Sequence, residues 1–150
     1  MKPEFSDYLE KTVGLTGLYL ERAENAINFY QNPFPEDIKD IFVSEYIDKE
    51  GARQYENLWI FTSNMVGEAK RFITEEDFDA TPIKNRIVYW RLKKIAFDGK
   101  KATNDSRMTI NISMDTDVRG ELKASKENCM KLQGIFDKYL VPNAIQIIDV

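Results

Sequence analysis

Basic side chains are concentrated in residues 84–101, where Asp98 is the single acid. The stretch holds seven cations: Lys84, Arg86, Arg91, Lys93, Lys94, Lys100 and Lys101. Clustered lysine and arginine side chains bind phosphate and carboxylate groups, so these residues are a candidate face for an anionic ligand. The alternative is an ordinary solvated strand face, because Lys and Arg are also the usual residues on the wet side of a sheet.

Groups that commonly run enzymatic reactions are scarce in the sequence. It has no histidine, which removes the usual general base and the commonest zinc ligand. Its one cysteine, Cys129, allows neither an internal disulfide nor a cysteine-based metal site, and we expect it to be a small buried hydrophobe. No glycine-rich phosphate loop is present. These features predict a protein that is not an enzyme and holds no cofactor and no metal.

Two groups of acidic residues were considered as sites. Glu75, Glu76, Asp77 and Asp79 lack the alternating ligands and the glycine of a calcium-binding loop, so they predict a solvated loop over residues 74–79. Asp115 and Asp117 lie between two expected strands, where aspartate commonly makes local hydrogen bonds, so they predict a turn.

Length, composition and charge are those of one folded domain, residues 1–150. The chain has 150 residues, of which 43% are hydrophobic, and no apolar run approaches the ~20 residues that span a bilayer. Residues 1–50 carry 5 basic and 11 acidic side chains, whereas residues 51–101 carry 10 and 7; the whole chain has a net charge of −4. Binding of duplex nucleic acid is therefore not expected. We expect a soluble protein and favour the cytoplasm.

Residues 1–50 predict a helical N-terminal extension. Apolar residues recur at helical spacing from Ser6 to Tyr30, and Gly14 and Gly17 indicate either a break in this helix or close packing over it. Residues 35–47 favour a second helix, although the alternation around Phe42 fits a strand as well.

After Gly51 the period changes to two, which predicts strands. We expect a hairpin with arms ending near Thr62 and Ile73, followed by a central strand, 83–97, that carries Val88, Trp90 and Leu92 on its inner face. Ile95 and Phe97 are out of step with Leu92, which predicts a bulge at Lys93–Lys94. Residues 108–114 and 118–124 predict two further strands.

The C-terminal part predicts a helix and an apolar tail. Ser125 is a candidate N-cap, and the helix has an apolar stripe made of Cys129, Leu132, Ile135, Phe136, Tyr139 and Leu140. Residues 141–150 form a tail that, from Ala144, alternates like an edge strand and should be covered by this molecule or by a partner.

Leu58–Trp59–Ile60–Phe61–Thr62, Ile83 to Phe97 and Met108 to Leu140 resemble the early strand, the resumed sheet, and the closing strands and helix of bacterial pleckstrin-homology-like (PH-like) domains. The resemblance is one of pattern and covers residues 54–140. It implies an α+β fold in which N-terminal helices precede a curved antiparallel sheet or PH-like barrel with a C-terminal capping helix. A helix-gripped sheet of the lipid-transfer type fits nearly as well.

Two classes of function follow from this fold. The first is an interaction module that binds a protein partner or a second copy of itself as a homodimer. The second is a small-ligand or lipid carrier whose cavity is closed by the helix. The PH-like resemblance also implies acidic-lipid head groups as a ligand of the basic residues, although Lys70–Arg71 is the only basic pair in the first hairpin.

Overall fold

The computed structural model describes residues 1–34, 37–83, 87–114 and 119–143, with the backbone alone at residues 87, 88 and 114. Its helical elements are α1 (Pro3–Asp7), the π-helical η1 (Tyr8–Val13), α2 (Gly17–Tyr30), α3 (Asn128–Ile135) and the π-helical η2 (Phe136–Leu140). Its strands are β1 (Asp40–Ile47), β2 (Arg53–Phe61), β3 (Met65–Lys70), β4 (Asp77–Pro82), β5 (Ile87–Ile95), β6 (Arg107–Met114) and β7 (Arg119–Ser125).

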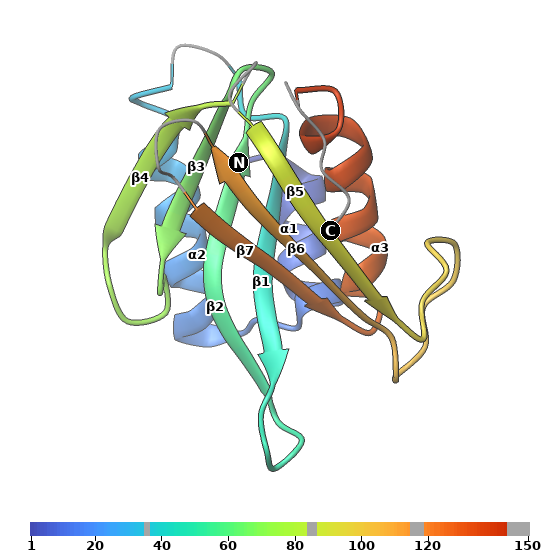
Figure 1. Ribbon diagram of the computed structural model, residues 1–150. Helices are drawn as coiled ribbons and strands as arrows, with labels where there is room; N and C mark the ends of the chain where they lie inside the picture. Colours follow the sequence, from blue (N-terminus) through green and yellow to red (C-terminus); the bar gives the residue numbers. More distant parts are fainter. Residues whose placement is uncertain (35–36, 84–86, 115–118, 144–150) are drawn as a thin grey trace.

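All strand pairs are antiparallel and form two sheets (Figure 1). Sheet A has the order β1-β2-β3-β4 and sheet B the order β5-β6-β7. The predicted α+β class, with helices first, antiparallel strands next and a helix last, is therefore confirmed. The sheets are not closed into a barrel by hydrogen bonds.

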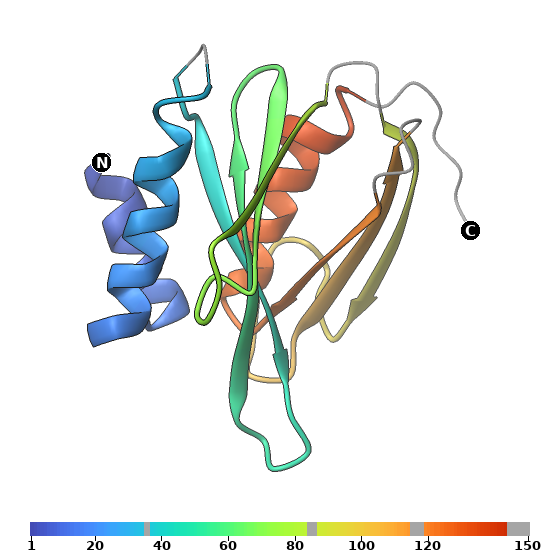
Figure 2. The same cartoon turned by 90° about the vertical axis from the view of Figure 1, so that its left-hand side faces the viewer.

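Sheet A is covered on both faces (Figure 2). The N-terminal helices pack on its outer face, while α3 and sheet B lie on its inner face. This arrangement explains why the four consecutive residues Leu58, Trp59, Ile60 and Phe61 are all at most 1% exposed. The apolar stripe of α3 and η2 fills the space between the sheets, with Cys129, Leu132 and Ile135 of α3 and Leu140 of η2 at 0% exposure.

The N-terminal helical segment breaks at Gly14. This is the first of the two alternatives that the sequence offered, a helix break or close packing over the helix. Gly14 has φ +84°, a left-handed conformation that favours glycine, and the amide of Leu15 donates to the carbonyl of Leu9 (2.9 Å) to close η1. The carbonyl of Val13 then accepts hydrogen bonds from Arg53 and Tyr55 of β2, 2.9 Å each. The helix end is thus tied to sheet A.

The buried carboxylate of Glu45 in β1 connects distant parts of the chain. It forms an ion pair with Arg53 and accepts hydrogen bonds from the Ser125 amide (3.0 Å), the Ser125 hydroxyl (2.8 Å) and Asn128 (3.3 Å). Asn128 also donates to the Val43 carbonyl (2.9 Å) and accepts from the Tyr8 hydroxyl (2.7 Å). One polar cluster therefore links η1, β1, β2, β7 and α3.

Two predictions on residues 1–50 and on the last helix are wrong. Residues 40–47 form strand β1 and not a helix, because pairing with β2 satisfies their backbone and both faces are covered. The N-terminal region is therefore not only a helical extension. Ser125 is the last residue of β7 and not an N-cap, since its hydroxyl is bonded to Glu45 and α3 begins at Asn128.

Three strand boundaries also differ from the predictions. The strand expected to reach Ile73 ends at Lys70, because Arg71 has φ +49° and turns the chain. Asp77 and Asp79 lie in β4 and not in a loop. The register of β5 is continuous through Lys93–Lys94 and shifts between Ile87 and Tyr89 instead.

The path of the chain at the end of β5 explains why the bulge predicted from Ile95 and Phe97 is absent at Lys93–Lys94. Ile95 stays in phase with Arg91 and Lys93 on the outer face and is 49% exposed. The chain turns at Ala96, which has φ +51°, and this turn brings Phe97 into the core at 8% exposure. Trp90 and Leu92 pack against the core as predicted. The expected turn 115–117 and the tail 144–150 lie outside the described residues.

We expect Glu45→Gln to lower the free energy of unfolding by about 3 kcal/mol, because removing one charge of a buried ion pair leaves the other uncompensated. Glu10→Gln, on the exposed side of η1, is the matched control and should change it by less than about 0.5 kcal/mol. Urea denaturation of both variants measures the difference. Equal stabilities would show that the buried cluster does not hold these elements together.

Gly120 of β7 allows the close approach of Trp59 across the two sheets. A Cβ at residue 120 would lie 2.4 Å from Cη2 of Trp59, whereas a Cβ at Gly134 of α3 would have nothing within 4 Å. We expect Gly120→Ala to destabilise the protein by about 1–3 kcal/mol through overpacking. Gly134→Ala should instead stabilise α3 by up to about 1 kcal/mol. Thermal unfolding of the pair tests this contrast, and a neutral Gly120→Ala would contradict the packing.

Candidate functional site

The outer face of sheet B carries most of the exposed cations that the strands provide. On β5 the outward residues are Tyr89, Arg91 and Lys93, because the inward residues Trp90 and Leu92 pack on the core. The register places Arg91 beside Asn111 and Glu121, and Lys93 beside Thr109 and Lys123. We call the five cations of this surface the basic face: Arg91, Lys93, Arg107, Arg119 and Lys123. Glu121 is the single acid that the described strands place among them.

Two of the five cations already have partners. Lys123 lies 2.9 Å from Glu56 and 3.3 Å from Glu121. Burial by itself would lower the pKa of Lys123, but the hydrogen bonds and charges of Glu56 and then Glu121 outweigh it and raise that pKa. Arg107 donates to the carbonyls of Asn104 (3.0 Å) and Ser106 (2.7 Å), so it is partly used in holding its own loop.

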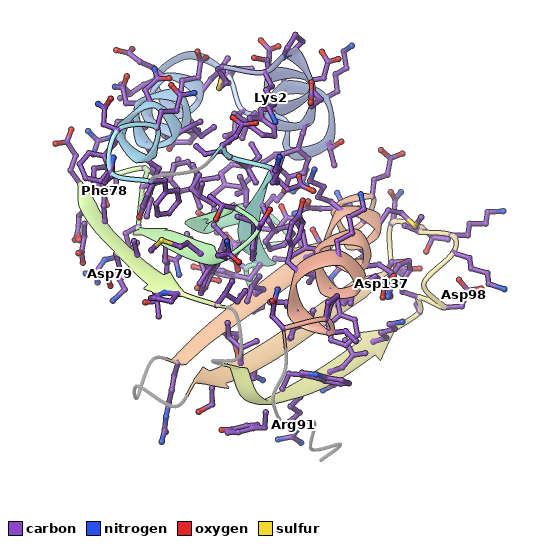
Figure 3. All side chains as sticks on the ribbon, turned by 90° about the horizontal axis from the view of Figure 1, so that it is seen from above. Lys2, Phe78, Asp79, Arg91, Asp98 and Asp137 are labelled. Atoms are coloured by element: carbon purple, nitrogen blue, oxygen red, sulfur yellow. The ribbon has the colours of Figure 1, made fainter. Side chains whose placement is uncertain are left out.

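The other three cations of the basic face are available. Arg91, Lys93 and Arg119 are exposed, and within the described part of the chain no carboxylate pairs with them. Figure 3 shows Arg91 on the outer side of sheet B, on the opposite side of the molecule from Lys2 and the N-terminal helices. Unpaired guanidinium groups can each hold a carboxylate or a phosphate through two parallel hydrogen bonds.

A shallow depression of about 630 Å³ lies on this face. It is lined by Tyr89, Arg91, Asn111, Ile112, Arg119, Gly120 and Glu121. The lining offers two guanidinium groups, a phenol, an amide and one carboxylate. Such a mixed set can bind a partner that places an acidic group near the two arginines and a hydrogen-bond donor near Glu121.

The seven cations predicted from the sequence do not form one surface. Arg91 and Lys93 share the basic face, whereas Lys94 pairs in register with the buried Met108 and its ammonium lies 5.6 Å from the centre of the Phe97 ring. Lys100 and Lys101 lie in the loop between β5 and β6. Lys84 and Arg86 lie outside the described residues.

Lys100 and Lys101 line a separate open groove of about 720 Å³ between η1, this loop and α3. Lys11 and Lys131 also line it, but Lys11 pairs with Asp7 (3.4 Å), and Lys131 pairs with Asp40 and stacks over the Tyr8 ring (4.8 Å). The loop itself is held by Asp98, whose carboxylate accepts from the amides of Lys100 (2.8 Å) and Lys101 (3.1 Å); these bonds lower its pKa. Only Lys100 and Lys101 are therefore unpaired cations of this groove.

Sequence reasoning missed Arg107, Arg119 and Lys123 as members of the basic face. The alternation of residues 108–114 correctly indicated one buried and one wet side, and Met108, Ile110 and Ile112 are buried. What it could not indicate was the register between strands, which places Lys123 and Arg119 in the same rows as the β5 residues.

Three of the four acidic residues at 75–79 form ion pairs. Glu75 pairs with Arg71 (3.1 Å), Glu76 with Arg22 (3.8 Å) and Asp79 with Lys70 (2.8 Å). Among the described residues, no three Asp, Glu or Cys side chains are grouped to hold a metal ion. Asp115 and Asp117 lie outside those residues. No helix in the described part of the chain is long and apolar enough to cross a membrane.

The chain was also compared with known proteins. The search against protein families, the search of curated proteins and the search of solved structures each found no match.

Proposed function

We propose that this chain is a non-enzymatic interaction module that binds an acidic protein surface through the basic face. The observation that carries the proposal is the set of unpaired cations, Arg91, Lys93 and Arg119, on one exposed sheet face of a chain whose net charge is −4. Rigid sheet backbones hold these side chains in fixed rows, so a partner meets a preorganised surface.

A protein surface fits the basic face better than a membrane or duplex DNA does. Glu121 lies in the same cross-strand row as Arg91 and Asn111, where a uniform array of phosphates would repel it. A protein can place an acid opposite an arginine and a donor opposite Glu121. Tyrosine and arginine are also the residue types enriched at protein interfaces. Acidic lipid remains the alternative ligand.

The order of four antiparallel strands, three antiparallel strands and a C-terminal helix supports a PH-like module as the proposed family. On this proposal the module would include β1, which belongs to the first sheet, together with residues 54–140. A cytoplasmic location stays a prediction. The carrier alternative gains no support from the interior, where Leu132, Ile135 and Leu140 of the helix fill the space between the sheets.

A second copy of this chain is one candidate for the acidic partner. The exposed side of the N-terminal helices carries Glu4, Asp7, Glu10 and Glu21, and it lies on the side of the molecule opposite to sheet B (Figure 2). The apolar stripe of these helices does not favour association, because Leu9, Val13 and Ile27 are 0% exposed within the monomer. Charge complementarity alone supports a self-contact.

The binding proposal is tested by the double reversal Arg91→Glu, Lys93→Glu. A displayed random-peptide library selected on the unmodified protein should yield sequences rich in Asp and Glu, and the reversal should weaken their binding at least about tenfold. Lys49→Glu, Lys138→Glu makes the same change in net charge at exposed positions away from sheet B and should leave binding unchanged.

Equal losses in the two double variants would show a response to net charge and not to this face. Vesicles containing phosphatidylserine form a second arm: binding to them that depends on Arg91 and Lys93, without acidic peptides being selected, would replace the protein partner with a lipid. Thermal unfolding verifies that both variants remain folded.

Self-association has a separate test. If copies meet through the acidic helices and the basic face, the mass measured by light scattering at low ionic strength should rise with concentration and fall when salt is added. The Arg91→Glu, Lys93→Glu variant should stay monomeric. If the wild-type protein is monomeric at all concentrations, self-association through the basic face is contradicted and the proposed partner is a different protein.

A further inference from the structure

A third opening is lined by residues of both sheets, where β4 of sheet A and the start of β7 of sheet B contribute to one pocket. It is a cleft of about 450 Å³, which we call the inter-sheet cleft. Its lining comes from β2, β3, β4 and β7: Trp59, Val66, Glu68, Lys70, Asp79, Ala80, Thr81 and Arg119. The volume and the mixture of apolar and charged groups are those of a small-molecule site.

The wall of the cleft contains a hydrogen-bond donor that has no acceptor. Trp59 is 1% exposed, and its indole Nε1 makes no hydrogen bond with any described residue. The ring edge formed by Cζ2 and Cη2 faces Gly120 of β7. A buried donor without an acceptor is costly and calls for an explanation.

Some of the charged groups that line the cleft have partners, and one does not. Lys70 and Asp79 neutralise each other across 2.8 Å. Glu68 accepts a hydrogen bond from Asn57 (2.8 Å). Arg119 is exposed at the mouth and, in the part of the chain that the structure describes, has neither an ion pair nor a hydrogen bond. The cleft therefore retains one free cation, Arg119, while the unpaired indole N–H of Trp59 is buried in its wall.

Glu68 adds little opposing charge at neutral pH. Burial raises the pKa of this carboxyl group to about 7; Lys70 lowers it, and Asp79 and Asp77 raise it further. Near neutral pH a substantial fraction of Glu68 is thus protonated and does not repel an anion.

We propose that the inter-sheet cleft binds a small monocarboxylate with a flat apolar group. The carboxylate pairs with Arg119, and the apolar group lies against the wall formed by Trp59, Val66 and Ala80. One carboxylate is enough, because Lys70 is already neutralised by Asp79. This site goes beyond the proposed protein-binding face but shares Arg119 with it.

The cleft and its charges also determine how binding should depend on pH. Loss of the proton from Glu68 adds a negative charge near the bound carboxylate. The charged groups around Glu68 are Lys70, Asp77, Asp79 and Arg119, together with Glu56, Arg71 and Glu121, which line an adjoining depression with it. Affinity should therefore fall as pH rises through about 7, and Glu68→Gln should remove this dependence.

The experiment titrates the ¹⁵N-labelled protein with phenylacetate, with 2-phenylethylamine as a probe of similar shape and opposite charge. The indole N–H resonance of Trp59, assigned with a Trp90→Phe variant, should shift saturably with phenylacetate and not with the amine. Arg119→Gln should weaken binding by about tenfold, the loss typical of one charge-assisted contact. Lys49→Gln is the matched control, because this exposed cation lies between β1 and β2 and does not line the cleft.

Three results would overturn the proposal: no shift of the Trp59 resonance, equal binding of the amine, or unchanged binding in Arg119→Gln. The test of the basic face uses Arg91 and Lys93, so either proposal can fail without the other.

Discussion

Burial of the Glu45 carboxylate is the constraint on which the arrangement of the two sheets depends. A charged group at 1% exposure is stable only when donors replace its water, and here the donors come from Arg53, Ser125 and Asn128. These residues belong to β2, β7 and α3. Sheet A, sheet B and the C-terminal helix must therefore adopt one relative position for the carboxylate to be satisfied.

The same cluster connects the N-terminal helices to this centre. Arg53 donates to Glu45 and also to the carbonyls of Thr12 and Val13 at the end of η1. Tyr8 donates to Asn128 and accepts from the Val43 amide. Burial raises the pKa of Tyr8 well above its usual value, so its hydroxyl stays neutral and keeps its proton for Asn128. Hydrophobic packing holds the helices against sheet A, while these directional hydrogen bonds determine their position on it.

This architecture separates charge across the molecule. The helices bring acidic side chains to one side, and the wet side of sheet B brings cations to the other (Figure 2). Between them, Gly120 lets Trp59 approach β7, and Trp59 also lines the inter-sheet cleft. The basic face and the cleft thus share the start of β7 but offer different chemistry, one an open cationic surface and the other a partly enclosed pocket.

The sequence by itself determined the class of the fold, the two-faced character of β6 and the apolar stripe of the C-terminal helix, since each follows from spacing within one segment. For Gly14 and Gly17 it left two alternatives, and the structure decided for a helix break at Gly14. Only the tertiary structure decided that residues 40–47 are a strand, because an apolar run covered on both faces has no diagnostic period. It also decided which cations share a face. The sequence indicated Arg91 and Lys93, and strand register places Arg119 and Lys123 on the same face. Lys94 was included from the sequence but, because side chains alternate along β5, it lies on the opposite face. Glu45 was not recognisable as special, because its partners Arg53, Ser125 and Asn128 are up to 83 residues away in the chain. Pairing between distant segments depends on how the whole chain packs, and local residue patterns do not record it.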